Sequence, residues 1–273
     1  ETMAELSKKL GLFESVRDVC HAVQIPLPGV VVVGEQSAGK SSLLENISGI
    51  QFPRAQNTCT RMPCVLTMLT DQSVTEPHAL VSMNSSFAEV EQCKVEEVEE
   101  KIRMLTEKHA TKEEFISRKA MFIRVIRPSG PQLSLIDLPG VTHNADKMAN
   151  IHEVTVALVE EYIKPLEMVI LCVIPAMSDF GNAEVVKLAR KYDPDGIRTL
   201  GVVTKCDDAA NAEASDIVEK VTMARESDVK LQLGFHCVVN RSQKNIDDGM
   251  TRGELWNKEE KAFNEGCLRD IPR

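Results

Sequence analysis

Residues 30–45, VVVVGEQSAGKSSLLE, decide how this chain folds. The four valines predict a buried strand, and the pattern Gly34-x-x-x-x-Gly39-Lys40-Ser41 predicts a loop that opens a helix. Glycines let backbone N–H groups turn towards bound phosphates, and the helix N-terminus adds a favourable dipole. Lys40 supplies positive charge to the β- and γ-phosphates, and the Ser41 hydroxyl can coordinate Mg²⁺. The stretch therefore predicts a phosphate-binding loop, but it does not identify the nucleotide.

The composition is that of a soluble globular chain. Its 273 residues, 43% hydrophobic and 27% charged, suit one large domain or two modest ones. The net charge of −9 argues against a nucleic-acid-binding surface. The apolar run 168–177 is about half the length of a ~20-residue membrane span, so we interpret it as a buried strand. No apolar leader is visible, and the first residue is not methionine, which suggests an excised fragment.

The eight cysteines are scattered through the sequence. They show neither metal-ligand spacing nor the pattern of a disulfide framework, which favours a reducing cytoplasm.

Strand-like and helix-like segments alternate along the chain. We expect strands at 30–34, 64–70, 120–128, 133–137, 168–176, 198–204 and 235–239, with 120–128 and 133–137 paired to each other. We expect helices at 5–23, 41–49, 87–114, 153–163, 182–192, 214–224 and 252–265. This alternation predicts an α/β fold: a mostly parallel sheet with helices on both faces. Residues 1–28 form a helical extension, which packs either on this domain or in a bundle with helices missing here, and 29–273 form one domain.

Two short motifs are candidates for the γ-phosphate and metal. Thr60 lies in a polar loop and could reach Mg²⁺ and the γ-phosphate, although Thr58 is a neighbouring candidate. Asp137-Leu138-Pro139-Gly140 follows a strand; the Asp137 carboxylate could hold the metal through water, and the Gly140 amide could reach the γ-phosphate.

Two further motifs are candidates for the base. In Thr204-Lys205-Cys206-Asp207, a carboxylate after a buried strand can accept two hydrogen bonds from guanine, which adenine cannot donate. The lysine stem can lie along the base. Asn240-Arg241-Ser242-Gln243, after the next strand, could close over base and ribose or could be an ordinary polar loop.

Taken together, GEQSAGKSS, PRAQNTCTRMP, DLPG, TKCD and VNRSQ resemble the GTPase domain of the dynamin superfamily, from about residue 5 to about residue 265. The resemblance implies a P-loop GTPase fold extended by a long insertion before DLPG, with GTP or GDP and Mg²⁺ as ligands. It implies nucleotide contacts from Glu35, Ser37, Ala38, Gly39, Lys40, Ser41, Ser42, Arg54, Thr204, Lys205, Asp207, Asn240, Arg241 and Gln243. Mg²⁺ would be held by Ser41, Thr60 and, through water, Asp137.

The resemblance also bears on catalysis. Small GTPases orient the attacking water with a glutamine directly after D-x-x-G, and this chain has Val141 there. By resemblance, Gln36 orients the water, while Ser37 and Asp179 hold a Na⁺ or K⁺ ion in place of an arginine finger. The implied catalytic residues are Gln36, Ser37, Lys40, Thr60 and Gly140. A homodimer across the nucleotide face would then stimulate hydrolysis.

One departure from the family pattern concerns the cation site. Ala55, Gln56 and Asn57 stand where the family often has glycines, and Asn57 does not share the backbone freedom of glycine. These departures, together with the valine at position 141, leave open an alternative function: a GTP-dependent switch or scaffold that hydrolyses GTP slowly. Self-assembly, membrane contact and membrane remodelling are expectations for a longer parent protein. That protein would be cytoplasmic, with peripheral contact to membranes.

Overall fold

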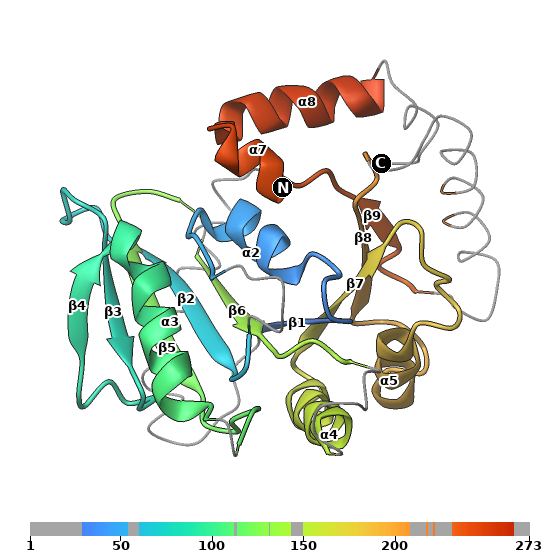
Figure 1. Cartoon of the computed structure of the whole chain (residues 1–273), viewed down its shortest axis with the longest axis horizontal. Helices are drawn as coiled ribbons and strands as arrows, with labels where there is room; N and C mark the ends of the chain where they lie inside the picture. The colour runs from blue at the N-terminus through green and yellow to red at the C-terminus, as the bar shows by residue number, and fades with distance from the viewer. Residues whose placement is uncertain are drawn as a thin grey trace.

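A computed structural model of the chain is shown in Figure 1. It describes residues 29–53, 60–111, 114–130, 132–142, 150–207, 217, 221 and 231–264. The helices expected over 5–23 and 214–224, and with them the extension 1–28, lie outside this part of the chain apart from residues 217 and 221.

The described residues form one nine-stranded sheet with helices around it. Its strands are β1 (Val30–Gly34), β2 (Cys64–Thr70), β3 (His78–Ser82), β4 (Glu91–Lys94), β5 (Met121–Arg127), β6 (Leu133–Asp137), β7 (Val169–Pro175), β8 (Thr199–Thr204) and β9 (Phe235–Cys237). The α-helices are α2 (Lys40–Ser48), α3 (Val98–His109), α4 (Ile151–Ile163), α5 (Glu184–Tyr192), α7 (Gln243–Asp247) and α8 (Arg252–Asn264), and η1 (Val95–Glu97) is a 3-10 turn.

The order of strands across the sheet is β4-β3-β5-β2-β6-β1-β7-β8-β9. The half from β6 to β9 is entirely parallel, and β2 is antiparallel to β6. Beyond β2, the strands β5, β3 and β4 come from the stretch between β2 and β6, so this insertion widens the sheet at one edge. The predicted α/β sheet and its insertion are therefore confirmed.

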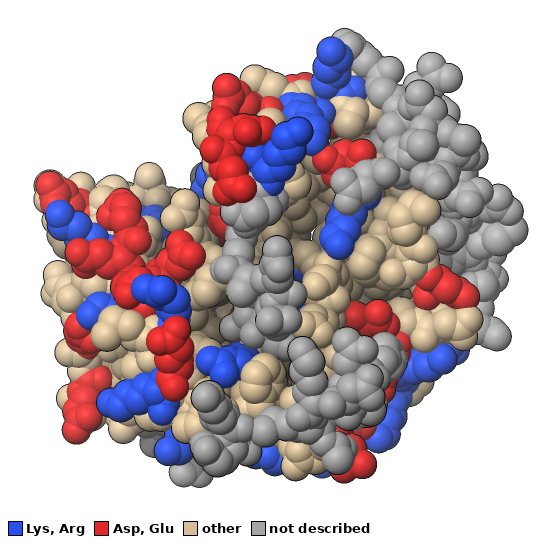
Figure 2. All heavy atoms as spheres, viewed as in Figure 1, with Lys and Arg blue, Asp and Glu red and all other residues tan. Residues whose placement is uncertain are grey.

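Two expectations about the insertion were wrong. Residues 87–114 are not one helix: β4 and η1 precede α3, and β4 pairs with β3, which the sequence analysis did not predict. Three of the four β4 side chains are exposed and only Cys93 is buried, as in a short polar edge strand. Lys101 of α3 forms an ion pair with Glu91 of β4, and Figure 2 shows charges of both signs mixed over this region.

β5 and β6 are not paired to each other, contrary to expectation. They lie on opposite sides of β2, with Leu66 of β2 opposite Ile123 on one side and Leu135 on the other. The connection between them crosses the end of β2, where the Asp71 N–H donates to Arg127 O at 2.8 Å. Two adjacent strand signals joined by a short loop suggested a hairpin, but β2 occupies the position between them.

Alternate side chains of β1 enter two hydrophobic cores, one on each face of the sheet. Val31 and Val33 pack with residues of α4 and α5, while Val32 packs with residues of α2 and α3. This arrangement explains the run of valines, because a strand covered on both faces has no polar side. The predicted helix cover on both faces is confirmed.

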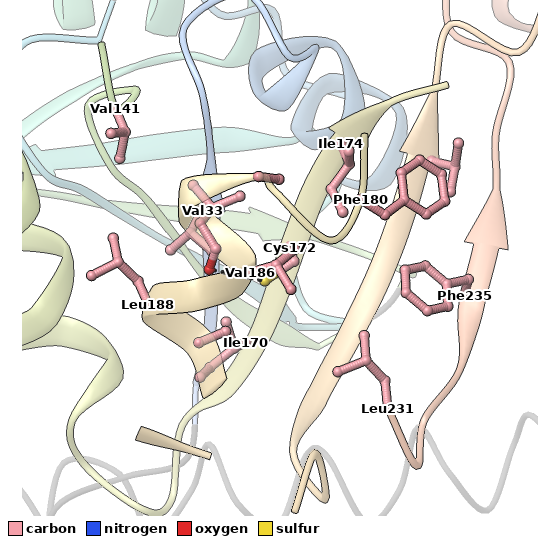
Figure 3. Packing of buried hydrophobic residues seen from close by; sticks show 14 of the residues in the cluster. Val33, Val141, Ile170, Cys172, Ile174, Phe180, Val186, Leu188, Leu231 and Phe235 are labelled. Atoms are coloured by element: carbon pink, nitrogen blue, oxygen red, sulfur yellow. Dashed lines mark hydrogen bonds between the residues drawn. The ribbon is translucent and has the colours of Figure 1, made fainter. Parts of the chain in front are cut away.

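A tight aromatic contact joins β8, β9 and the loop after β7. The rings of Phe180 and Phe235 stack with centroids 5.6 Å apart (Figure 3). Gly201 of β8 lies under this stack, and a Cβ there would overlap the Phe235 ring. None of the helices in the described part of the chain combines the length and hydropathy that spanning a membrane requires.

Candidate nucleotide-binding site

The predicted motifs meet at one edge of the sheet. Because β1, β6, β7, β8 and β9 are parallel, their carboxyl ends lie along that edge, where ligands of open α/β sheets bind. The antiparallel strand β2 begins there, with Cys64 opposite Asp137. This register brings Thr60, just before β2, to the same edge as the loop after β1.

The phosphate-binding loop is folded tightly between β1 and α2. Ser37 and Gly39 both adopt positive φ, 62° and 95°, and the buried hydroxyl of Thr204 donates to Ala38 O at 2.6 Å. A non-glycine residue in this region costs about 1 kcal/mol or more, and such strain is typical of functional loops. Ser37 is also exposed, so it faces solvent at this edge. Thr204 therefore holds the loop from β8.

Lys40 is almost completely buried beside the loop. Its ammonium donates to the carbonyl oxygens of Gly34 and Glu35 at 3.1 and 3.0 Å. A Cβ on Gly140 would lie 2.7 Å from Lys40 Nζ and 2.9 Å from Gln36 Cα. Only glycine therefore fits at this end of DLPG, and the Gly140 backbone lies directly against the phosphate-binding loop.

Thr60 and Asp137 form the candidate Mg²⁺ site. The Thr60 hydroxyl donates to Asp137 Oδ2 at 2.8 Å, while the buried Oδ1 has no hydrogen-bond partner among the described residues. Burial raises the pKa of Asp137 to about 6, although nearby Lys40 and the bond from Thr60 both lower it. The carboxylate is therefore largely ionised at neutral pH, and one of its oxygens has no partner among the described residues, so this donor set fits a hydrated Mg²⁺ ion.

Val141 turns its side chain away from the candidate site. The residue is 1% exposed and packs in the core with α4 and α5 (Figure 3). Its backbone binds the phosphate-binding loop on both sides: the Gln36 N–H donates to Val141 O at 2.8 Å, and the Val141 N–H donates to Gly34 O at 3.2 Å. Val141 therefore holds the phosphate-binding loop through its backbone, and its apolar side chain cannot orient water.

The TKCD motif begins with Thr204, the last residue of β8, and continues into a turn in which Lys205 is exposed and Cys206 is buried. Lys205 is exposed and has φ 57°, a second strained non-glycine residue at this edge. Asp207 accepts a hydrogen bond at 2.6 Å from the ammonium of Lys258, which lies in α8. The Asp207 carboxylate, which we predicted to bind guanine, therefore forms an ion pair with Lys258, a residue that lies outside the motifs.

The VNRSQ segment is tied to α2. Asn46 donates to Asn240 Oδ1 at 2.6 Å, and the buried amide nitrogen of Asn240 has no partner among the described residues. The Arg241 guanidinium pairs with buried Glu45 and donates to Met250 O. Asn240 thus has a donor available for a ligand, and the buried Nε of Arg241 is likewise without a partner among the described residues.

The remaining predicted residues are only partly defined. The Asp179 carboxylate accepts bonds from the Gly181 N–H and the Asn182 side chain, at 3.0 and 2.6 Å, which shape the loop after β7. Ser41 and Ser42 lie in the first turn of α2. Arg54 and the departures at 55–57 lie outside the described residues, as does the side chain of Gln243.

Sequence reasoning missed the residues that connect this edge to the rest of the molecule. Glu45 and Asn46 of α2 and Lys258 of α8 make these contacts across separations of 196, 194 and 51 residues. None belongs to a recognisable motif. A polar or charged residue on a helix is expected to face solvent unless its partner is known. No local sequence signal therefore identified these three residues.

The site and fold together define a P-loop nucleotide-binding domain, and comparison with known proteins identifies its family. Residues 30–206 match the sequence profile of the dynamin family, which covers more than half of the chain. The chain therefore belongs to the dynamin family and is a GTPase domain of that family, as the sequence motifs predicted.

Individual relatives come from plants and animals. The chain is 38% identical over 234 residues to dynamin-related protein 4C of Arabidopsis thaliana, covering 85% of this chain and 33% of that protein. It is 33% identical over 258 residues to the interferon-induced GTP-binding protein Mx of Perca fluviatilis, covering 94% of this chain and 84% of that protein. The corresponding Mx1 protein of Otaria byronia is also 33% identical, and the chain spans 38% of its length.

Proposed function

We propose that this domain hydrolyses GTP in a Mg²⁺-dependent reaction that accelerates when two nucleotide faces meet. The observation that carries the proposal is the junction of three segments at one edge: Lys40 in the phosphate-binding loop, the bonded pair Thr60–Asp137, and Gly140 against Gln36. In the reaction, water attacks the γ-phosphorus, the bond to the bridging oxygen breaks, and GDP leaves.

Each segment has a distinct task in this proposal. Lys40 and the backbone amides of the loop bind the phosphates and stabilise the charge that develops on them. Ser41, Thr60 and, through water, Asp137 would hold Mg²⁺, which would neutralise charge on the β- and γ-phosphates. Asp207 selects guanine through paired hydrogen bonds, and the partnerless amide nitrogen of Asn240 supplies a further donor.

Water must be oriented by a residue other than Val141, whose side chain is buried in the core. Gln36 is the candidate, because its backbone is fixed by Val141 and its position adjoins Gly140. We propose that Gln36 orients the water and that Ser37 and Asp179 bind Na⁺ or K⁺. The exposure of Ser37, Asp179 and Lys205 at this edge supports a face that a second copy of the domain could cover.

The parent protein is proposed to assemble further and to act at membranes from the cytoplasm through segments other than this domain. Both plant and mammalian relatives are much longer than the chain, which supports such additional segments.

Phosphate release measured over a wide range of protein concentrations tests the proposal. We expect GTP turnover that requires Mg²⁺, a specific activity that rises with protein concentration, and faster turnover in Na⁺ or K⁺ than in a large organic cation. Lys40→Ala is the inactive control, because it removes the charge beside the phosphates.

Each outcome distinguishes a clause of the proposal. A specific activity independent of concentration would refute dimer stimulation, and equal rates in all cations would refute the monovalent site. GTP that remains intact on the protein after prolonged incubation would favour the alternative, a slow nucleotide-dependent switch, for which the buried side chain of Val141 is the structural argument.

A further inference from the structure

Lys258 of α8 binds the carboxylate on which base recognition depends. Its ammonium lies 2.6 Å from Asp207 Oδ2, and the side chains of Lys258 and Asp207 are 39% and 20% exposed. The pair is therefore accessible to solvent on one side, and both side chains can rearrange when a ligand arrives.

The helix backbone fixes Lys258 near this position. Leu255, one turn earlier, is completely buried, and the next residue, Glu259, accepts a hydrogen bond from the Val239 N–H at 2.9 Å. Arg252, at the start of α8, donates to Asn46 O of α2. In Figure 1, α8 lies beside α2 and α7. Lys258 therefore contacts Asp207 from a helix that is held in place at several points.

The chemistry of guanine makes this ion pair consequential. Hydrogen bonds from a neutral donor to an unpaired carboxylate are stronger than those between neutral groups. An ammonium that already pairs with Asp207 reduces this advantage, because it neutralises the acceptor and occupies one of its oxygens. Its positive charge also repels the N–H edge of guanine, which is itself electropositive.

We propose that Lys258 competes with guanine for Asp207 and thereby sets how tightly the site binds and how fast it releases guanine nucleotides. The inference rests on the proposed role of Asp207 in guanine binding. Lys258 is a specificity-determining residue in this account: it lowers affinity for guanine, and it leaves adenine nucleotides unaffected because they do not use the carboxylate.

Calorimetric titration of the 273-residue chain with GDP and with ADP tests the inference. Lys258→Met removes the charge and keeps most of the stem, and Lys258→Arg keeps the charge. Lys261→Met is the matched control, because Lys261 is an exposed lysine on the same helix. A partly exposed ion pair contributes little free energy, so we expect Lys258→Met to bind GDP about two- to five-fold more tightly than the wild type.

The other arms give the expected pattern. Lys258→Arg and Lys261→Met should bind GDP like the wild type, ADP binding should not change in any variant, and the gain should shrink in about 0.5 M salt because salt screens the pair. Lys258→Gln serves as a second neutral variant should Lys258→Met fail to fold.

Two results would overturn the inference in different ways. Equal or weaker GDP binding by folded Lys258→Met or Lys258→Gln, with normal GDP binding by the wild type, would refute the competition alone. Absence of GDP binding by the wild-type chain would refute the proposed function together with this inference.

Discussion

Asp137 lies at the end of β6; the residue is 2% exposed, and its Oδ1 has no hydrogen-bond partner in the part of the chain that the structure describes. Its pKa of about 6, raised chiefly by burial, means that the nucleotide-free protein holds a proton there more tightly than the unfolded chain does. Between pH 3.8 and about 6 the folded state therefore binds more protons, and the free energy of unfolding decreases as pH rises through this window. Above this window the carboxyl group is ionised, and its charge stays buried beside Lys40 and the Thr60 hydroxyl.

Asp137→Asn should consequently raise the free energy of unfolding of the nucleotide-free domain at pH 7.5, because the buried charge is removed. The gain should largely disappear near pH 5, where the wild-type carboxyl group is already protonated. Urea unfolding at the two pH values, without Mg²⁺, measures both differences.

The same variant should lose Mg²⁺-dependent hydrolysis. A variant that is less stable at pH 7.5, or a stability difference that does not change with pH, would contradict our assignment of a charged, unmetallated Asp137.

The motif residues were predictable because their task is local. Gly34, Gly39 and Lys40 form a loop whose geometry follows from a strand, glycines and a helix start, and the structure has all three. Lys258 could not be predicted, because its partner Asp207 is 51 residues away and one lysine on a polar helix resembles any other. The bond from the Thr204 hydroxyl to Ala38 O could not be predicted either, because the two residues are 166 positions apart.

Among the elements, β8 and β9 show how a single glycine sets the packing next to the loops that carry TKCD and VNRSQ. Gly201 leaves room for the Phe235 ring, which stacks on Phe180 beneath the loop after β7. Gly201→Ala should displace that ring and lower the free energy of unfolding by roughly 1–3 kcal/mol, as overpacking of a core does.

Gly253→Ala is the matched control, because a Cβ there meets nothing within 4 Å in the first turn of α8. It should leave stability unchanged or raise it by up to ~1 kcal/mol, since alanine favours helix. Equal effects of the two substitutions in a denaturation experiment would contradict the packing described for β8 and β9.

The limits of sequence reading are clear in the inserted elements. β4 resembles a helix in composition, and its identity as an edge strand depends on pairing with β3, which no local pattern encodes. Similarly, β5 and β6 looked like partners because they are adjacent in sequence, and only the path of β2 between them settles the order.

At the scale of the whole molecule, the parallel half of the sheet aligns the strand ends that carry the family's motifs. Lys40 follows β1, Asp137 ends β6 and Asp207 follows β8. α2 contacts the β9–α7 loop through Asn46 and Asn240, and α8 through Asn46 and Arg252. The central claim is that this edge is one guanine-nucleotide site, with Asp207 choosing the base.

Binding of guanine and xanthine nucleotides to wild type and Asp207→Asn tests this claim most directly. An amide can donate to the xanthine carbonyl that replaces the guanine amine, whereas it cannot accept both guanine hydrogen bonds. We predict that the wild type prefers GDP and that Asp207→Asn prefers XDP, with the phosphate contacts unchanged. An Asp207→Asn variant that still prefers GDP would contradict the assignment of the base-binding site.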